Sequence, residues 1–450
     1  MVQISLGFLS LCFIGFLVLK KTPGREFVNV HLINFLLLFL LVDILNQFLS
    51  GYTSRHDESY MVAAILLSLL YVLLIWTLST IPSFKRTSQL AFDVLASDGY
   101  PFSQYAILLW LAFKTYLWGR YGLQSLSYLA LFEQGGTSGS PLSYVETTIL
   151  TSLLYLANGA VVALVVRVSH LGCRQISAIE WLLLIVFFVF ILLGEAPLGV
   201  RRTVILYAII FITTYSNANS NSFKILGLSI AIGAIGIAFI EYYQQIRFNA
   251  SNPEIYHLLS SGNASDILSG IAAYLTPGTQ SATTHGFRTG GLDYLATCIR
   301  AVEKSGDLME GSLLLFSLYK VIPSPFYEGK STLDIDTYVS SFFRMEQTDY
   351  AANLLANLYV DVGIFSIILA PILWWSIIFV MLLILSRART NSPFALSVSG
   401  MIFGMLSLVE GSLISLFTYF RDIFIILPIF YLIGVLLGKL KSTSVTVSSR

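Results

Sequence analysis

Residues 364–385 read IFSIILAPILWWSIIFVMLLIL and contain no charged side chain. About 20 apolar residues in a helix are needed to cross the hydrocarbon core of a bilayer, which is about 30 Å thick. Inside a membrane the backbone must satisfy its own hydrogen bonds, so an apolar run of this length predicts a transmembrane α-helix. Pro371 lies within the run and predicts a tilt or a kink.

Comparable apolar runs recur along the chain, which has 450 residues, 56% of them hydrophobic and only 11% charged. A soluble domain carries about 25% charged residues. A transmembrane β-barrel would show short alternating segments instead. The sequence therefore predicts an all-α polytopic membrane protein with eleven spans, at residues 3–19, 28–49, 60–80, 103–119, 146–166, 178–194, 201–216, 224–241, 354–386, 394–419 and 422–438.

The first apolar run is interpreted as a retained span, because its positive charges follow the run instead of preceding it. Net charge is +1, which gives no indication of nucleic-acid binding. Cys12, Cys173 and Cys298 imply no disulfide framework.

Lysines and arginines in the short connections predict the orientation of the chain in the membrane. One alternating set is basic and includes Lys20, Lys85 and Arg387, whereas the opposite set is poorer in basic residues. The N-terminus is therefore predicted outside and the C-terminus in the cytoplasm. For a bacterial cell this places a multi-pass protein in the inner membrane.

One long segment, residues 242–352, is compatible with water and divides the chain. Eight predicted spans precede it in residues 1–241, and three spans with a cytoplasmic tail follow it in residues 353–450. Within it, Leu292, Leu295, Ile299 and Val302 recur at helical spacing, and the run at 311–320 is apolar but too short to span. The orientation places this segment outside, where it is expected to cap a membrane-embedded site.

Ionisable residues within predicted spans gather toward the outer face of the membrane. They are Asp43, Lys114, Glu195, Arg201, Arg202, Asp361 and Glu410, with Arg421 and Asp422 expected in an outer turn. Charges inside a membrane are costly and mark functional sites. An ion-coupled transporter would carry them near the midplane, so the asymmetry favours chemistry at the outer boundary.

A sugar carried on a lipid diphosphate is a substrate that suits these groups. Arginine binds phosphate oxygens bidentately and stays charged, and a carboxylate or histidine takes the proton from an acceptor hydroxyl. The catalytic candidates are Arg201, Arg202, Glu195, His285 and Asp349. The substrate-binding candidates are Arg247, Arg288, Asp293, Arg300, Lys320, Lys330, Arg344 and Tyr327. No metal-binding motif stands out, so a metal-independent reaction is expected.

The chain resembles the repeat-unit polymerases of bacterial surface polysaccharides, the Wzy type. Four features carry the resemblance: the spans with one large outer loop, the arginine pair in GEAPLGVRRTV, the segment from Ile322-Pro323 to Lys330, and the polar run TDYAANLLANLYVDVGIFS. It covers residues 178–390, while the first part of the chain matches only as apolar spans. Where the family usually has Pro-Arg this chain has Pro323-Ser324, so Lys320 or Lys330 would take that role.

The resemblance implies a GT-C-like membrane glycosyltransferase that joins two undecaprenyl-diphosphate-linked oligosaccharides. Arg201 and Arg202 would hold the diphosphate, and Arg288, Arg300 and Arg344 would grip the second lipid diphosphate or the glycan. His285, Glu195 and Asp349 are the base candidates. A chain-length regulator and a flippase are implied partners, alongside membrane lipid.

Two other functions stay open. An O-antigen ligase would transfer the glycan to a lipid core, but the His-x7-Gly pattern of ligases fits neither His257 nor His285. A flippase or exporter of lipid-linked sugars would need charge along a path through both leaflets, and no large outer loop.

Overall fold

A computed structural model describes most of the chain as helix. The described residues are 25–36, 58–96, 102–121, 144–171, 177–195, 200–218, 263–275, 291–323, 335–345, 353–388, 392–406 and 412–447, with isolated residues at 6, 9, 10, 12, 13, 39, 254, 257, 258 and 326. All regular structure in these ranges is helical, in agreement with the predicted all-α class.

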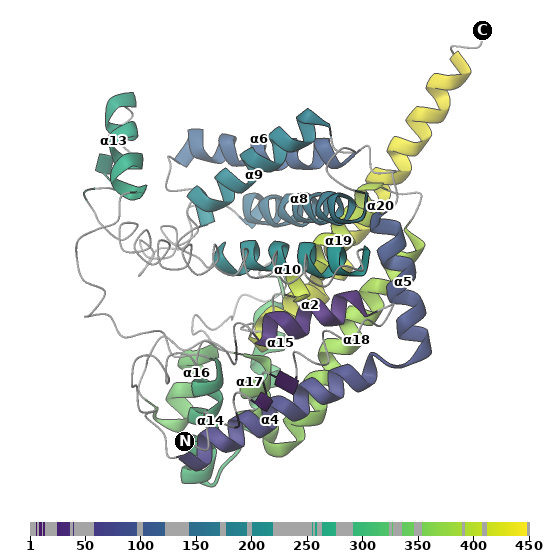
Figure 1. Cartoon of the computed structure of the whole chain (residues 1–450). Coiled ribbons are helices and arrows are strands. Elements are labelled where there is room, and N and C mark those ends of the chain that lie inside the picture. The colour runs from purple at the N-terminus through teal and green to yellow at the C-terminus, as the bar shows by residue number, and fades with distance from the viewer. Residues whose placement is uncertain are drawn as a thin grey trace. The chain divides into compact units, whose positions relative to one another are not determined.

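The chain divides into two compact units, each taken here by itself. The first comprises residues 1–94, 287–389 and 401–433, and the second comprises residues 95–286, 390–400 and 434–450. The helices that make up most of the first unit are α2 (Glu26–Phe35), α4 (Glu58–Leu78), α5 (Pro82–Ala96), α14 (Gly291–Ser305), α15 (Ser312–Val321), α16 (Ile335–Phe343), α17 (Leu354–Val362) and α18 (Ser366–Arg387) (Figure 1). The second contains α6 (Ser103–Tyr121), α8 (Tyr144–Leu171), α9 (Ala178–Glu195), α10 (Val200–Ala218) and α13 (Ala264–Leu275). Two further helices, α19 (Ser392–Leu406) and α20 (Leu413–Val447), continue across the division.

Four helices among the described residues are long and apolar enough to cross a membrane. They are Glu58–Leu78, Val145–Ser169, Leu354–Arg387 and Leu413–Leu437. Shorter apolar helices occupy Ala178–Ile191, Leu206–Tyr215, Ser312–Val321 and Ser392–Leu406. An α-helical membrane protein is therefore supported, whereas the predicted count of eleven spans is not established, and the first and eighth predicted spans lie almost wholly outside the described residues.

The predicted span at 354–386 is broken near its beginning. Gly363 has φ +62°, a left-handed conformation that favours glycine, and a single 3-10 turn at Gly363–Phe365 separates α17 from α18. Helix α18 then continues from Ser366 to Arg387 with Pro371 inside it, and the predicted tilt or kink at this proline stays a prediction. The glycine, and not the proline, divides this span.

The predicted turn at Arg421 and Asp422 is wrong. Both residues lie inside α20, which begins at Leu413 and continues to Val447. The two charges pair with each other at 2.6 Å between Arg421 Nη2 and Asp422 Oδ1, so the helix accommodates them without a turn. The predicted span at 394–419 is also divided, because it includes α19 (Ser392–Leu406) and the start of a separate helix, α20, at Leu413.

Helix α5 was not anticipated, because residues 81–102 were assigned to a connection. Its Phe84 is fully buried and stacks on Trp375 and Phe379 of α18, with ring centroids 5.7 Å and 5.9 Å apart. Its Lys85 and Arg86 face the more open side. The connection is thus an amphipathic helix folded back on a span.

In the second unit, α8 packs along α6 and α10 (Figure 1). Glycines allow one close crossing, between α8 and α19. A Cβ atom on Gly159 would collide with the carbonyl oxygen of Leu396, and one on Gly400 with that of Tyr155. Small residues at such a crossing are typical of helix pairs in membranes.

Candidate functional site

One face of α17 carries three buried polar side chains, Asn353, Asn357 and Asp361, which we call the α17 ladder. They are spaced four residues apart and are at most 2% exposed. Residues at this spacing lie one above another on a helix. Each member bonds the beginning of a different helix, so α17 organises the structure around it.

Asn353 joins α17 to α14. Its Oδ1 accepts a hydrogen bond of 2.8 Å from the backbone N–H of Ala356 and so caps α17, while its Nδ2 donates at 3.0 Å to the carbonyl of Gly291. Gly291 leaves no room for a side chain, because a Cβ atom there would press on the ring of Phe39. The beginning of α14 is therefore fixed from two sides.

Asn357 and Asp361 hold two further helix starts. Asn357 Oδ1 accepts from the N–H of Leu413 at 3.1 Å, at the beginning of α20. Asp361 accepts from the N–H groups of Leu313 and Leu314, at 3.0 Å and 3.1 Å, in the first turn of α15. The first N–H groups of a helix have no partner within it, and a carboxylate there is also favoured by the helix dipole.

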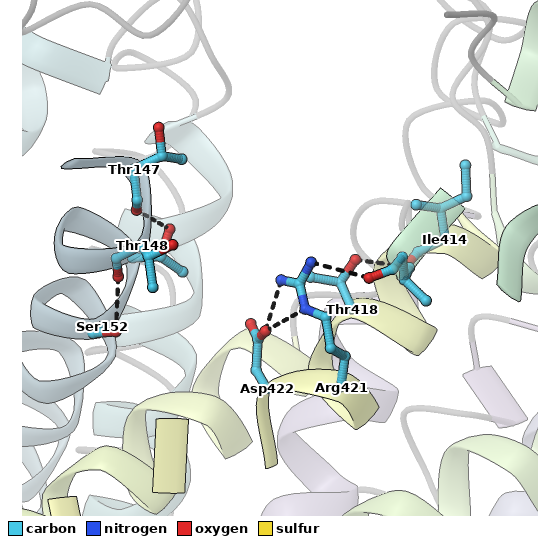
Figure 2. Close-up of polar contacts among 9 residues, drawn as sticks. Thr147, Thr148, Ser152, Ile414, Thr418, Arg421 and Asp422 are labelled. Atoms are coloured by element: carbon cyan, nitrogen blue, oxygen red, sulfur yellow. Dashed lines mark hydrogen bonds and ion pairs between the residues drawn. The ribbon is translucent and has the colours of Figure 1, made fainter. Parts of the chain in front are cut away.

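The opposite end of α15 is held by α20. Arg421 Nη1 lies 3.4 Å from the carbonyl oxygen of Val321, the last residue of α15. The Nε of the same arginine donates to Asp422 Oδ1 at 2.8 Å, which sets its direction (Figure 2). Helix α15 therefore has an anionic side chain at its N-terminal end and a cationic side chain at its C-terminal end. The helix dipole favours this arrangement.

Lys320 is the predicted substrate-binding residue on α15. Its Nζ lies 5.6 Å from the ring centroid of Phe316, and Phe316 stacks on Tyr338 of α16 with centroids 4.4 Å apart and rings 6° from parallel. A cation over an aromatic face is stabilised by about 0.5–1 kcal/mol at an exposed site. Lys320 is half-buried, so its charge is positioned by this stack.

Helix α14 carries two of the predicted residues, in different surroundings. The apolar face is confirmed, since Leu292 and Leu295 are fully buried and Ile299 is 7% exposed. Asp293 is also buried, because the first turns of α14 are enclosed by α4 and α17. Arg300 lies where the helix emerges and is half-buried. Asp293 therefore lies in the packed part of the segment at 242–352, and Arg300 is the more accessible of the two residues.

Arg344 follows the last residue of α16 and is exposed. The backbone angle φ of Arg344 is +53°, which is unusual for a residue other than glycine. The N–H group of the next residue, Met345, donates a hydrogen bond to the carbonyl oxygen of Ser340. This is the position at which a helix end favours glycine. The backbone there stabilises a helix end, while the arginine residue itself is exposed.

The structure joins α15, the helix that carries Lys320, to the α17 ladder through its first turn, a grouping that the sequence prediction did not contain. Most other predicted site residues cannot be placed. The side chains of Glu195, at the end of α9, and of Arg201 and Arg202, in the first turn of α10, lie outside the described part of the structure. The remaining ones are wholly outside it: Arg247, His285, Arg288, Tyr327, Lys330 and Asp349.

Asn353 and Asn357 were not predicted as functional residues. Their spacing with Asp361 was a signal in the sequence, because a recurrence of polar residues every fourth position on an apolar helix marks one face. Among the described residues, no group of three or more metal-binding side chains lies together. Comparisons found no matching family model, curated protein or solved structure.

Proposed function

We propose that the protein is a membrane glycosyltransferase that polymerises oligosaccharide repeat units carried on undecaprenyl diphosphate. The growing glycan moves from its lipid carrier to a sugar hydroxyl of an incoming lipid-linked unit. The reaction takes place at the outer face of the membrane, beneath the segment at 242–352.

The observation that best supports this proposal is the attachment of the first turn of α15 to Asp361 of α17. Two of the four features that carry the resemblance to the polymerases are sequence segments in this unit, one beginning at Ile322 and the other containing the α17 ladder. Asp361 bonds the first turn of α15, and α15 ends at Val321, directly before Ile322. The helix that leads directly into the first segment is therefore bonded to the second segment, which begins a candidate membrane span.

A fixed assembly of this kind suits the chemistry. As the anomeric carbon leaves its phosphate oxygen, negative charge develops on the lipid diphosphate. Cations held in place before the reaction stabilise that charge without reorganising, which is often the largest catalytic contribution. Lys320 and Arg300 are the cations of this unit to which we assign this role.

The step balances as a simple substitution. The acceptor oxygen forms a bond to the anomeric carbon, and the bond from that carbon to the diphosphate oxygen breaks. The acceptor proton passes to a base, for which Glu195, His285 and Asp349 are candidates. Undecaprenyl diphosphate leaves with the electron pair, and the reaction needs no oxidant, reductant or further co-reactant.

The test uses the purified full-length protein and the host's undecaprenyl-diphosphate repeat unit, in the presence of EDTA, with products separated on a gel. A ladder spaced by one repeat supports polymerisation without a metal. Glycan found only on an added lipid core acceptor would identify a ligase. Folded protein that leaves the substrate unchanged would contradict the proposal and favour a transporter.

The arginine assignment is tested in the same assay with Arg201→Ala/Arg202→Ala. We expect the ladder to be lost or reduced by at least about a hundredfold, since removing one group that stabilises developing charge typically costs that much. Arg86→Ala, an exposed arginine of α5, is the matched control and should keep the ladder. A ladder that survives the double substitution would make the pair a membrane anchor.

A further inference from the structure

Arg25, the residue before the first turn of α2, is buried and has two donor atoms that meet no acceptor in the described part of the chain. It is 3% exposed, and its guanidinium carbon lies 4.7 Å from the ring centroid of Trp76. These two nitrogens are Nε and Nη1, which are buried and have no hydrogen-bond acceptor among the described residues. One face of the guanidinium is therefore covered by an indole, while its N–H groups are left without acceptors.

Leaving these donors without acceptors is costly. A guanidinium does not lose its proton in proteins, so it cannot escape the cost of burial by becoming neutral. Burial lowers the pKa of Arg25, which expresses the same unfavourable environment for the charge. The carboxylate of neighbouring Glu26 is also buried, but neither Nε nor Nη1 bonds it.

The surroundings indicate where a partner would come from. Trp76 lies at the end of α4, one of the helices that could cross a membrane, and tryptophan is common where such helices meet water. The indole Nε1–H of Trp76 is likewise buried without an acceptor. Three donor atoms of two contacting side chains thus lack an oxygen at the end of a candidate span.

We propose that Arg25 and Trp76 form a binding site for a phosphate group, supplied by the headgroup of an anionic phospholipid. Phosphate oxygens accept from several N–H donors at once, and guanidinium–phosphate pairs are among the strongest hydrogen-bonded contacts. Basic sites between helices at the membrane surface recognise lipid headgroups in this way. The proposal is independent of the glycosyltransferase activity.

The test compares full-length wild type with Arg25→Gln in a maltoside detergent that contains no phosphate. Phosphatidylglycerol, diacylglycerol or inorganic phosphate is added, and the thermal unfolding midpoint and the lipid retained in native mass spectrometry are measured. Arg86→Gln is the control, because Arg86 is an exposed arginine on α5 in the same unit.

We expect phosphatidylglycerol to raise the midpoint of wild type and Arg86→Gln but not of Arg25→Gln. Wild type should retain about ten times more of this lipid than Arg25→Gln, and diacylglycerol should have no effect. If inorganic phosphate alone reproduces the rise, the site takes free phosphate and the headgroup assignment is wrong.

Equal responses of wild type and Arg25→Gln would overturn the site. Should Arg25→Gln fail to fold, wild type alone decides the matter, because an equal response to phosphatidylglycerol and to diacylglycerol would show that no phosphate is recognised.

Discussion

At the scale of single residues, Asp361 shows how a charge in a candidate membrane span can be structural. Its carboxylate is fully buried and bonds two N–H groups of α15. A buried carboxylate without such donors would be strongly unfavourable. The position therefore couples the beginning of the membrane helix to a helix of the loop.

Asp361→Ala should loosen the beginning of α15. Two buried N–H groups lose their acceptor, at a cost of about 1–3 kcal/mol for a buried group left unsatisfied. Hydrogen exchange at Leu313 and Leu314 should accelerate by about tenfold or more, with α4 unchanged. Asp307→Ala, an exposed aspartate close to α15 in sequence, is the control and should leave exchange as it is. Unchanged exchange in Asp361→Ala would mean that α15 is held by its other contacts.

Arg344→Gly separates a structural role from a binding role. Glycine adopts positive φ without strain, so this substitution should stabilise the protein by up to about 1 kcal/mol in thermal unfolding. If the side chain grips substrate, polymerisation should fall at the same time. Glu310→Gly is the matched control, since Glu310 has φ +51° and is exposed. Should Arg344→Gly keep full activity, Arg344 has no part in binding.

Contacts of single residues also show which features could not be predicted from the sequence. The pairing of Arg421 with Asp422 could not be predicted, because charges in a span indicate either a turn or a neutralised pair, and only tertiary packing decides. Burial of Asp293 depends on α4, which is remote in sequence. By contrast, the buried face of α14 followed from its own periodicity.

At the scale of helices, packing in the second unit depends on glycine. Gly159 and Gly400 lie where the backbones of α8 and α19 approach each other, and a backbone carbonyl cannot turn aside as a side chain can. The crossing is therefore set by residue size.

Gly159→Ala should destabilise the protein by about 1–3 kcal/mol, the usual cost of overpacking. The thermal unfolding midpoint in detergent is the measurement. Gly119→Ala, on α6, is the control, because a Cβ atom there meets nothing within 4 Å. It should be neutral or stabilising by up to about 1 kcal/mol, since alanine favours helix. A midpoint for Gly159→Ala equal to that of Gly119→Ala would mean that the two helices do not approach this closely.

Helix boundaries were predictable where local signals were strong. Pro323 follows closely after Val321, where α15 ends, and α9 and α10 begin within a residue of the predicted spans. The amphipathic helix α5 was not predicted, since it lies in the basic connection between the predicted spans 60–80 and 103–119. Its packing on α18 through Phe84 is a tertiary contact that the local pattern does not contain.

At the scale of the whole molecule, the account requires the loop helices and the connection after α4 to lie on opposite sides of the membrane. Ser305, at the end of α14, and Ser83, near the start of α5, are both exposed. In a Cys12→Ser/Cys173→Ser background, Ser305→Cys should react with an impermeant maleimide in intact cells, and Ser83→Cys only after the membrane is opened. Labelling of both positions in intact cells would refute the predicted orientation.

The central claim is that a glycosidic bond forms as a lipid diphosphate leaves. The most direct test measures, with purified protein and the lipid-linked repeat unit, the undecaprenyl diphosphate released and the glycosidic bonds formed over the same interval. The account predicts one molecule released for each bond, with both lost in Arg201→Ala/Arg202→Ala. Intact lipid-linked substrate in the presence of folded protein, with neither bond nor release, would contradict it.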